Sequence, residues 1–171
     1  MDKNDLFDVF AYEIHYADGI SVLKEGSNTV FMTETEGTYI KQTIPPDPER
    51  VATQTTYFAN TLTISGEGQF LKGWDLEIGI WKEYDREGQL INEVNKDEHY
   101  PISWGEMKGC FLANDIRITE IRQLRRTQDP TSGRYCWVLT LKSDHGILDT
   151  ACFDAETGEL IKREQTMIEV I

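Results

Sequence analysis

The chain has 171 residues, of which 39% are hydrophobic, 27% are charged and 11% are aromatic. This composition excludes the class of intrinsically disordered chains, which are poor in apolar and aromatic residues, and the length is enough to bury one good core or two small ones. The formal net charge of −13 disfavours a nucleic-acid partner, because phosphate groups require a positive surface.

Short strands separated by turns are predicted for the first part of the chain. Residues 7–16 are rich in aromatics and are included in this β-rich part. The prolines of residues 45–48 lack amide donors, so this segment is expected to form an exposed loop. A further strand is predicted over residues 55–64, a glycine-containing turn over 65–68, and the start of the next strand over 69–71. The strands expected before the prolines span residues 20–23, 28–32 and 37–44.

The most informative stretch is G-I-W-K-E-Y-D-R-E-G-Q-L, residues 79–90. A short strand that carries Trp81 and Tyr84 leads into an Asp-x-x-Gly turn, and a second strand starts at Leu90, which predicts a hairpin over residues 79–95. The stretch resembles the MORN-variant repeat, G-x-W-x-x-Y-D-x-x-G-x-L. The preceding glycine-rich segment is similar to a degenerate neighbour, so that the resemblance covers about 57–95. It implies a protein of the kind found as antitoxin or immunity component of bacterial toxin pairs.

One helix is predicted in the second part of the chain, over residues 104–113. Ser103 and Glu106 fit a capping box, in which each side chain bonds the backbone amide of the other residue. Trp104, Met107 and Phe111 then recur on one helical face. The following segment, 117–126, has spacings that suit either a strand or a helix, and we take it as a strand.

The remaining sequence predicts antiparallel strands over residues 135–141, 147–153 and 159–170, with turns at 143–146 and 154–158. The segments Y-C-W-V-L and F-D-A-E-T-G-E-L-I within it resemble the PepSY-type module, which has W-x-V on one strand and then a D-x-x-T-G-x-[LI] turn. In such a turn Asp caps through its side chain and Gly accepts a positive φ. The resemblance covers about 101–171 and implies a regulatory module that binds a peptidase or a peptide.

The expected fold is α+β, with mostly antiparallel β-sheets built from hairpins and a meander and one short helix near 104–113. We expect an acidic, β-rich N-terminal part over residues 1–98 that contains the MORN-variant-like hairpins. A PepSY-like C-terminal part over residues 99–171 would hold the helix and a second antiparallel sheet.

The compartment is predicted from the N-terminus and the cysteines. The first residues lack the basic and apolar regions of a signal peptide, and no apolar run is long enough to span a membrane. Cys110, Cys136 and Cys152 are odd in number and form no C-x-x-C pair, which favours reduced thiols in the cytoplasm. Cys136 and Cys152 could nevertheless meet across neighbouring strands and form a disulfide.

Residues that could carry chemistry are few. His15, His99 and His145 have no metal-site spacing; the acidic residues 97–98 before His99 are read as a solvated loop and Cys110 as core filler. No phosphate-binding glycine loop, nucleophile elbow or zinc motif is present in the sequence. We therefore expect no catalytic residue, no metal and no cofactor, with an enzyme lacking a known motif as an alternative.

The negative charge is concentrated in residues 1–100, which carry 19 acidic and 8 basic residues. Such a surface steers basic molecules towards it and favours a basic protein partner, although excess acid can also serve solubility alone. Aromatic residues surrounded by acids are a plausible anchor for that partner, with core packing as the alternative. The predicted partner-binding residues are Trp74, Asp75, Glu77, Trp81, Glu83, Tyr84, Asp85 and Glu87.

The arginines of the second part are either paired internally or a site for an anionic partner. They are Arg117, Arg122, Arg125, Arg126 and Arg134.

Taken together, the patterns in the sequence predict a non-catalytic, soluble binding protein of the immunity or antitoxin type that neutralises a basic toxin partner, without nucleic acid or membrane. The alternatives are the PepSY-like regulatory module and an uncharacterised enzyme, and the oligomeric state stays open.

Overall fold

The structure is a computed structural model that describes residues 5–141 and 147–167. It divides into two compact units, Met1–Lys96 and Asp97–Ile171, and the division lies two residues before the boundary that the sequence suggests. We describe the two units separately.

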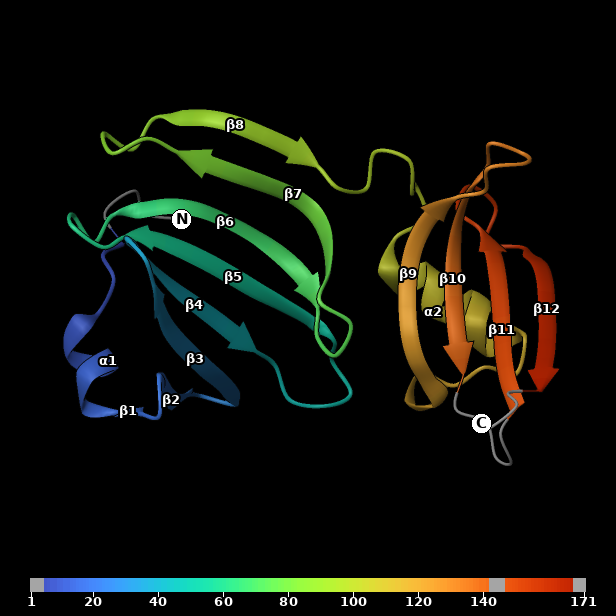
Figure 1. Ribbon diagram of the computed structural model, residues 1–171, viewed down its shortest axis with the longest axis horizontal. Helices are drawn as coiled ribbons and strands as arrows, with labels where there is room; N and C mark the ends of the chain where they lie inside the picture. Colours follow the sequence, from blue (N-terminus) through green and yellow to red (C-terminus); the bar gives the residue numbers. More distant parts are fainter. Residues whose placement is uncertain (1–4, 142–146, 168–171) are drawn as a thin grey trace. The chain divides into compact units, whose positions relative to one another are not determined.

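The N-terminal unit is a meander of antiparallel strands that follow one another across one sheet in chain order (Figure 1). Each strand between the first and the last pairs with the strand before it and the strand after it, so every connection is a hairpin. The strands are β1 (Tyr16–Ala17), β2 (Ile20–Glu25), β3 (Asn28–Thr35), β4 (Thr38–Ile44), β5 (Val51–Phe58), β6 (Ile64–Leu71), β7 (Leu76–Tyr84) and β8 (Leu90–Asn95).

A short helix, α1 (Val9–Ile14), replaces the β structure that we expected for residues 7–16. Asp8 caps it by accepting a hydrogen bond from the amide of Ala11 at 2.9 Å. Two aromatic residues of this segment belong to the core of the unit: the Phe7 ring stacks 4.4 Å from that of Tyr39, and both Phe7 and Tyr12 are buried. Phe10 and Tyr16 are exposed. Core packing therefore explains Phe7 and Tyr12, and the Asp8 cap favours a helix over a strand in this segment.

The turn that we predicted at residues 65–68 is wrong, because these residues lie inside β6. The chain turns earlier, after Phe58, where the amide of Leu62 donates to the Phe58 carbonyl at 2.7 Å and Leu62 adopts a φ of 62°. Gly68 serves packing: a Cβ built on it would lie 2.2 Å from the Trp81 ring. The glycine thus makes room for an aromatic side chain that lies across the backbone.

Replacing Gly68 with alanine is expected to destabilise the N-terminal unit by about 1–3 kcal/mol, the usual range for overpacking. Urea denaturation followed by far-UV circular dichroism measures this change. The same substitution in a Trp81→Val background should cost less than half as much, because the clashing ring is gone. Equal costs in both backgrounds would show that the ring is not what requires a glycine here.

The C-terminal unit is a four-stranded antiparallel sheet, in the order β12-β11-β10-β9, with one helix against it (Figure 1). The predicted helix is confirmed as α2 (Trp104–Ala113), including both bonds of the Ser103–Glu106 capping box and a C-cap at Asn114. Of the ambiguous segment 117–126, the first part is a 3₁₀ turn, η1 (Ile118–Glu120), and the rest is strand. The strands are β9 (Ile121–Gln128), β10 (Tyr135–Leu141), β11 (Ile147–Asp154) and β12 (Leu160–Met167).

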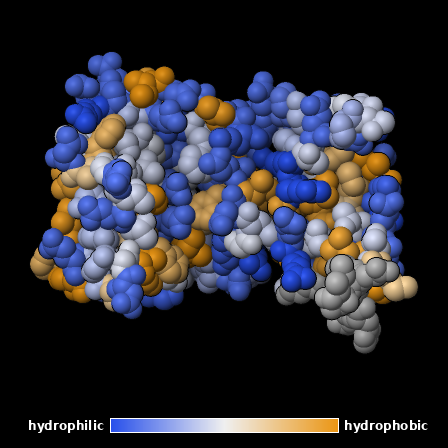
Figure 2. All heavy atoms as spheres, in the orientation of Figure 1, coloured by the Kyte–Doolittle hydropathy of each residue, from blue (hydrophilic) through white to orange (hydrophobic). Residues whose placement is uncertain are grey.

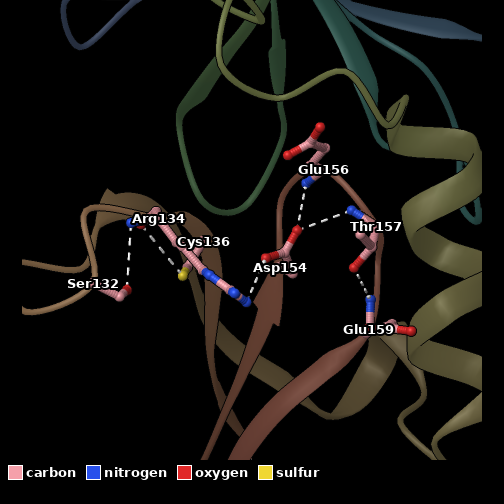
Figure 3. A network of polar contacts seen from close by, with 7 residues as sticks. All are labelled: Ser132, Arg134, Cys136, Asp154, Glu156, Thr157 and Glu159. Atoms are coloured by element: carbon pink, nitrogen blue, oxygen red, sulfur yellow. Dashed lines mark hydrogen bonds and ion pairs between the residues drawn. The ribbon is translucent and has the colours of Figure 1, made fainter.

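The turn between β11 and β12 has the construction that the sequence predicts (Figure 3). The Asp154 carboxylate accepts hydrogen bonds from the amides of Glu156 and Thr157, each at 2.9 Å, and Gly158 has a φ of 73°. These amide bonds and the nearby Arg134 guanidinium hold the pKa of Asp154 below its ordinary value. The turn predicted at residues 143–146 and the end of the last strand, 168–170, lie outside the described residues.

The fold is thus strand-dominated and antiparallel, as predicted, and its described residues hold one helix of more than two turns, α2, beside the shorter helices α1 and η1. In the C-terminal unit, the apolar face of α2 packs on the sheet. The Phe111 ring lies 5.0 Å from that of Phe153 on β11, and the Trp104 ring lies 6.2 Å from that of Trp137 on β10. This arrangement matches the predicted apolar face of the helix.

Candidate functional site

The predicted hairpin over residues 79–95 is confirmed as β7 and β8, and its turn carries two of the predicted site residues. The Asp85 carboxylate accepts a hydrogen bond from the Gln89 amide at 2.7 Å, and Gly88 has a φ of 78°. Asp85 therefore orders the turn, whereas Glu87 is exposed on it.

Trp81 is half-buried on β7, where its ring lies against Gly68. Its indole Nε1 donates to the carbonyl of Gln69 at 3.1 Å, so the orientation of the ring is fixed. The Lys96 ammonium lies 5.8 Å from the centre of the same ring and pairs with Glu77 at 2.5 Å. An aromatic ring and a carboxylate thus already hold one ammonium group here, by cation–π attraction and charge.

Tyr84, at the end of β7, donates its hydroxyl to Glu67 on β6 at 2.6 Å. Burial and this bond to a carboxylate raise the pKa of Tyr84 to about 12, so the phenol stays protonated and keeps its role as a donor. Glu83 lies between Trp81 and Tyr84 in the sequence and accepts a hydrogen bond from the Asn92 amide group at 3.1 Å.

These side chains border a groove of about 470 Å³ along β5 to β8. Of the eight predicted site residues, four line it. Several lining residues were not predicted from the sequence, among them Phe58, Ile91, Val94 and Lys96. The predicted residues that line it are Glu77, Trp81, Glu83 and Tyr84.

Trp74 and Asp75 lie apart from the groove, in the turn between β6 and β7. The Arg50 guanidinium lies 5.6 Å from the centre of the Trp74 ring, and Asp75 has a φ of 50°, which marks it as a turn residue. Four of the eight predicted residues therefore line the groove, and Trp74 and Asp75 do not.

β8 forms one wall of the groove and is the last strand in the order of the sheet. All six of its residues are exposed, including Leu90 at 51%, Ile91 at 64% and Val94 at 41% of full exposure. Figure 2 shows hydrophobic patches among hydrophilic atoms at the edge of the N-terminal unit where β8 lies. Large apolar side chains on an edge strand are typical of a surface that takes a partner.

The five arginines of the predicted group include paired and exposed side chains. The Arg126 side chain is only 7% exposed and pairs with Asp97, and its guanidinium lies 4.5 Å from the centre of the Tyr100 ring and 4.1 Å from that of Trp137. The Arg134 side chain is largely exposed and lies 3.6 Å from the Asp154 carboxylate. The three remaining arginines of the predicted group are exposed: Arg117, Arg122 and Arg125.

Histidines, cysteines and grouped carboxylates are the remaining side chains that could carry chemistry. Within residues 5–141 and 147–167, no group of three His, Cys, Asp or Glu side chains is placed to hold a metal ion. The His99 ring stacks 4.1 Å from that of Tyr135, and His145 lies outside the described residues. The three cysteines are free thiols, so the disulfide that we considered is not formed, and burial raises the pKa of the Cys136 thiol to about 12.

Comparison with known proteins gives no match to this chain among protein-family models, curated proteins or solved structures. The resemblances to MORN-variant repeats and to the PepSY-type module therefore stay predictions from the sequence. Across the described parts of the chain, none of the helices has the length and apolar character needed to cross a membrane.

Proposed function

We propose that this chain is a non-catalytic binding protein of the bacterial immunity or antitoxin type, which acts in the cytoplasm and neutralises a basic toxin domain. The observation that carries the proposal is the β7–β8 groove, in which an aromatic ring, exposed apolar side chains and carboxylates lie together. The stretch with the MORN-variant resemblance is the same stretch that forms this groove.

The groove supports binding of cationic side chains because its groups are already ordered. Trp81 is held by its bond to Gln69 and Tyr84 by its bond to Glu67. Lys96 shows how an ammonium is held, with the Trp81 ring on one side and Glu77 as ion-pair partner. A partner lysine or arginine would meet the remaining carboxylates of the groove, Glu67 and Glu83, and preorganised side chains reduce the entropy lost on binding.

The acid surplus of the N-terminal unit adds a long-range contribution. Complementary potentials speed diffusional encounter and are screened by salt. Binding of a basic partner is therefore expected to weaken as the salt concentration rises, with the groove itself setting which basic protein is retained.

Two matched triple variants test this proposal. The groove triple, Glu67→Gln, Glu77→Gln and Glu83→Gln, changes three carboxylates that line the groove. It and a control triple each remove three negative charges, so both change the long-range potential of the chain equally. The measurement is affinity capture from the native host's lysate at low salt, read by mass spectrometry. The amount of basic partner captured is expected to fall about tenfold for the groove triple and less than twofold for the control. The control triple is Glu13→Gln, Glu34→Gln and Glu36→Gln.

Equal losses for both triples would mean that net charge alone governs capture and that the groove has no part in it. If no basic protein is captured by the unaltered chain at low salt, the toxin-neutralising function is overturned.

Peptide binding by the C-terminal unit is a second candidate function, favoured by β12. This strand lies at the edge of its sheet, and every residue of it except Leu160 is exposed. An edge strand binds an extended peptide mainly through backbone hydrogen bonds. Capture of a peptidase in an amount that does not change with the salt concentration would favour this candidate.

A further inference from the structure

The outer edge of β8 is an open position in the N-terminal sheet. The strand order of the described chain ends there, and all six residues of the strand are exposed. Natural edge strands are commonly protected by lysine or proline, and the sequence of β8, L-I-N-E-V-N, contains neither. Its single charged residue is Glu93.

The backbone direction of β8 follows from one hydrogen bond. The amide of Lys96, just after the strand, donates to the carbonyl of Gly79 at 2.8 Å. The amide and carbonyl groups of successive residues in an antiparallel strand point alternately to its two sides. Val94 and Asn92, two and four residues before Lys96, therefore point their backbone amide and carbonyl groups towards β7. Glu93 directs its amide and carbonyl away from β7, to the outer edge.

The register between β7 and β8 indicates which side chains an added strand would meet. Val94 is the partner of Trp81 and Glu93 is the partner of Lys82, and successive residues of a strand point to opposite faces. An added strand would therefore place apolar side chains beside Val94 on one face and basic side chains beside Glu93 on the other. Cross-strand pairs of two apolar side chains, or of two side chains of opposite charge, are favourable.

We propose that β8 takes an extended segment of the partner, with alternating basic and apolar residues, as an additional strand of the N-terminal sheet. This inference rests on the proposed function and specifies how the basic partner is held. Backbone hydrogen bonds at the outer edge supply affinity, and the alternation of Val94 and Glu93 selects the sequence.

Two synthetic peptides test the mode of binding. The first is a fluorescein-labelled peptide of six Lys-Val repeats, and the second has six Lys-Pro repeats, with equal charge but no amide at alternate positions. Fluorescence anisotropy with the full chain at low salt is expected to show at least tenfold tighter binding of the Lys-Val peptide.

A pair of substitutions at one position tests the edge itself. Glu93→Pro removes an amide at the outer edge, where proline is compatible with a strand, and Glu93→Thr removes the same charge but keeps the amide. The proline variant is expected to bind the Lys-Val peptide at least tenfold more weakly than the threonine variant. Thermal melts followed by circular dichroism confirm that both variants are folded, and amide hydrogen exchange of the unaltered chain is expected to slow at Glu93 when the peptide is bound.

The outcomes separate this inference from the proposed function. Equal binding of the two peptides, together with equal binding by the two Glu93 variants, would overturn strand addition and leave an electrostatic acidic surface. If neither peptide binds while a basic protein is still captured in a salt-sensitive manner, strand addition is overturned and the proposed function stands. If peptide binding and capture are both absent, both are overturned.

Discussion

Replacing Phe111 with alanine is expected to lower the free energy of unfolding of the C-terminal unit by about 4 kcal/mol, within the usual range for buried aromatic residues. Phe111 is fully buried, and its ring lies 5.0 Å from that of Phe153 and 6.2 Å from that of Trp104. Truncation leaves a cavity between α2 and the sheet that neither element can close alone. Urea denaturation of the full chain, with amide hydrogen exchange to assign the unfolding to this unit, measures the loss.

The next residue of the helix is a matched control. Leu112 is 66% exposed, so Leu112→Ala removes a side chain of similar apolar character from the exposed side of α2. We expect a change within about 0.5 kcal/mol, as for surface substitutions elsewhere. Similar losses for the two variants would mean that α2 does not pack on the sheet through its Phe111 face.

Removing the carboxylate of Asp97 is expected to destabilise the C-terminal unit by about 3 kcal/mol. The Arg126 guanidinium that it pairs with is almost fully enclosed by the Tyr100 and Trp137 rings. Breaking a buried ion pair by removing one partner leaves the other charge in a poorly solvated place, which costs about 3–5 kcal/mol. We take the lower end because 36% of the Asp97 side chain is exposed.

A double-mutant cycle measures this pair. Arg126→Met keeps the length of the side chain and removes the charge, so it should cost less than Asp97→Ala. In the Arg126→Met background, Asp97→Ala should then cost less than about 1 kcal/mol, since no buried charge is left behind. Denaturation of the four proteins gives the coupling energy. Additive effects would show that the two charges do not depend on each other.

Features that depend on a few neighbouring residues could be predicted from the sequence. The Ser103–Glu106 capping box is a local pattern of bonds, and α2 begins where that pattern places it. The turn at Asp154 likewise needs one carboxylate, two nearby amides and one glycine. For the same reason the β7–β8 hairpin was predictable from its aromatic strand and its Asp-x-x-Gly turn.

Features that depend on residues distant in the sequence could not be predicted from it. Gly68 resembles a turn residue until the Trp81 ring is known to lie on it, and that contact joins two strands through a register that no local pattern encodes. The segment of α1 is equally ambiguous, because Phe7 is a core residue through its stacking on Tyr39 of β4.

The candidate site shows the same division. Trp81 and Tyr84 could be selected as neighbours in the sequence, but the residues that share the groove with them come from three other strands and depend on how those strands pair. Trp74 was selected on the same ground, yet it lies in the turn before β7 and does not line the groove. Ile91 and Val94 were missed because their exposure depends on the position of β8 at the edge, which only the strand order reveals.

The meander of the N-terminal unit also bears on how the chain folds as it is made. Each strand pairs with the one synthesised just before it, so the sheet can grow by one hairpin at a time, and each step closes only a short loop. At every stage the newest strand is the open edge, and it is covered as soon as the next one emerges. β8 is the last strand in this order, so the folded protein retains at β8 the unpaired edge that each earlier strand has only until the next strand pairs with it.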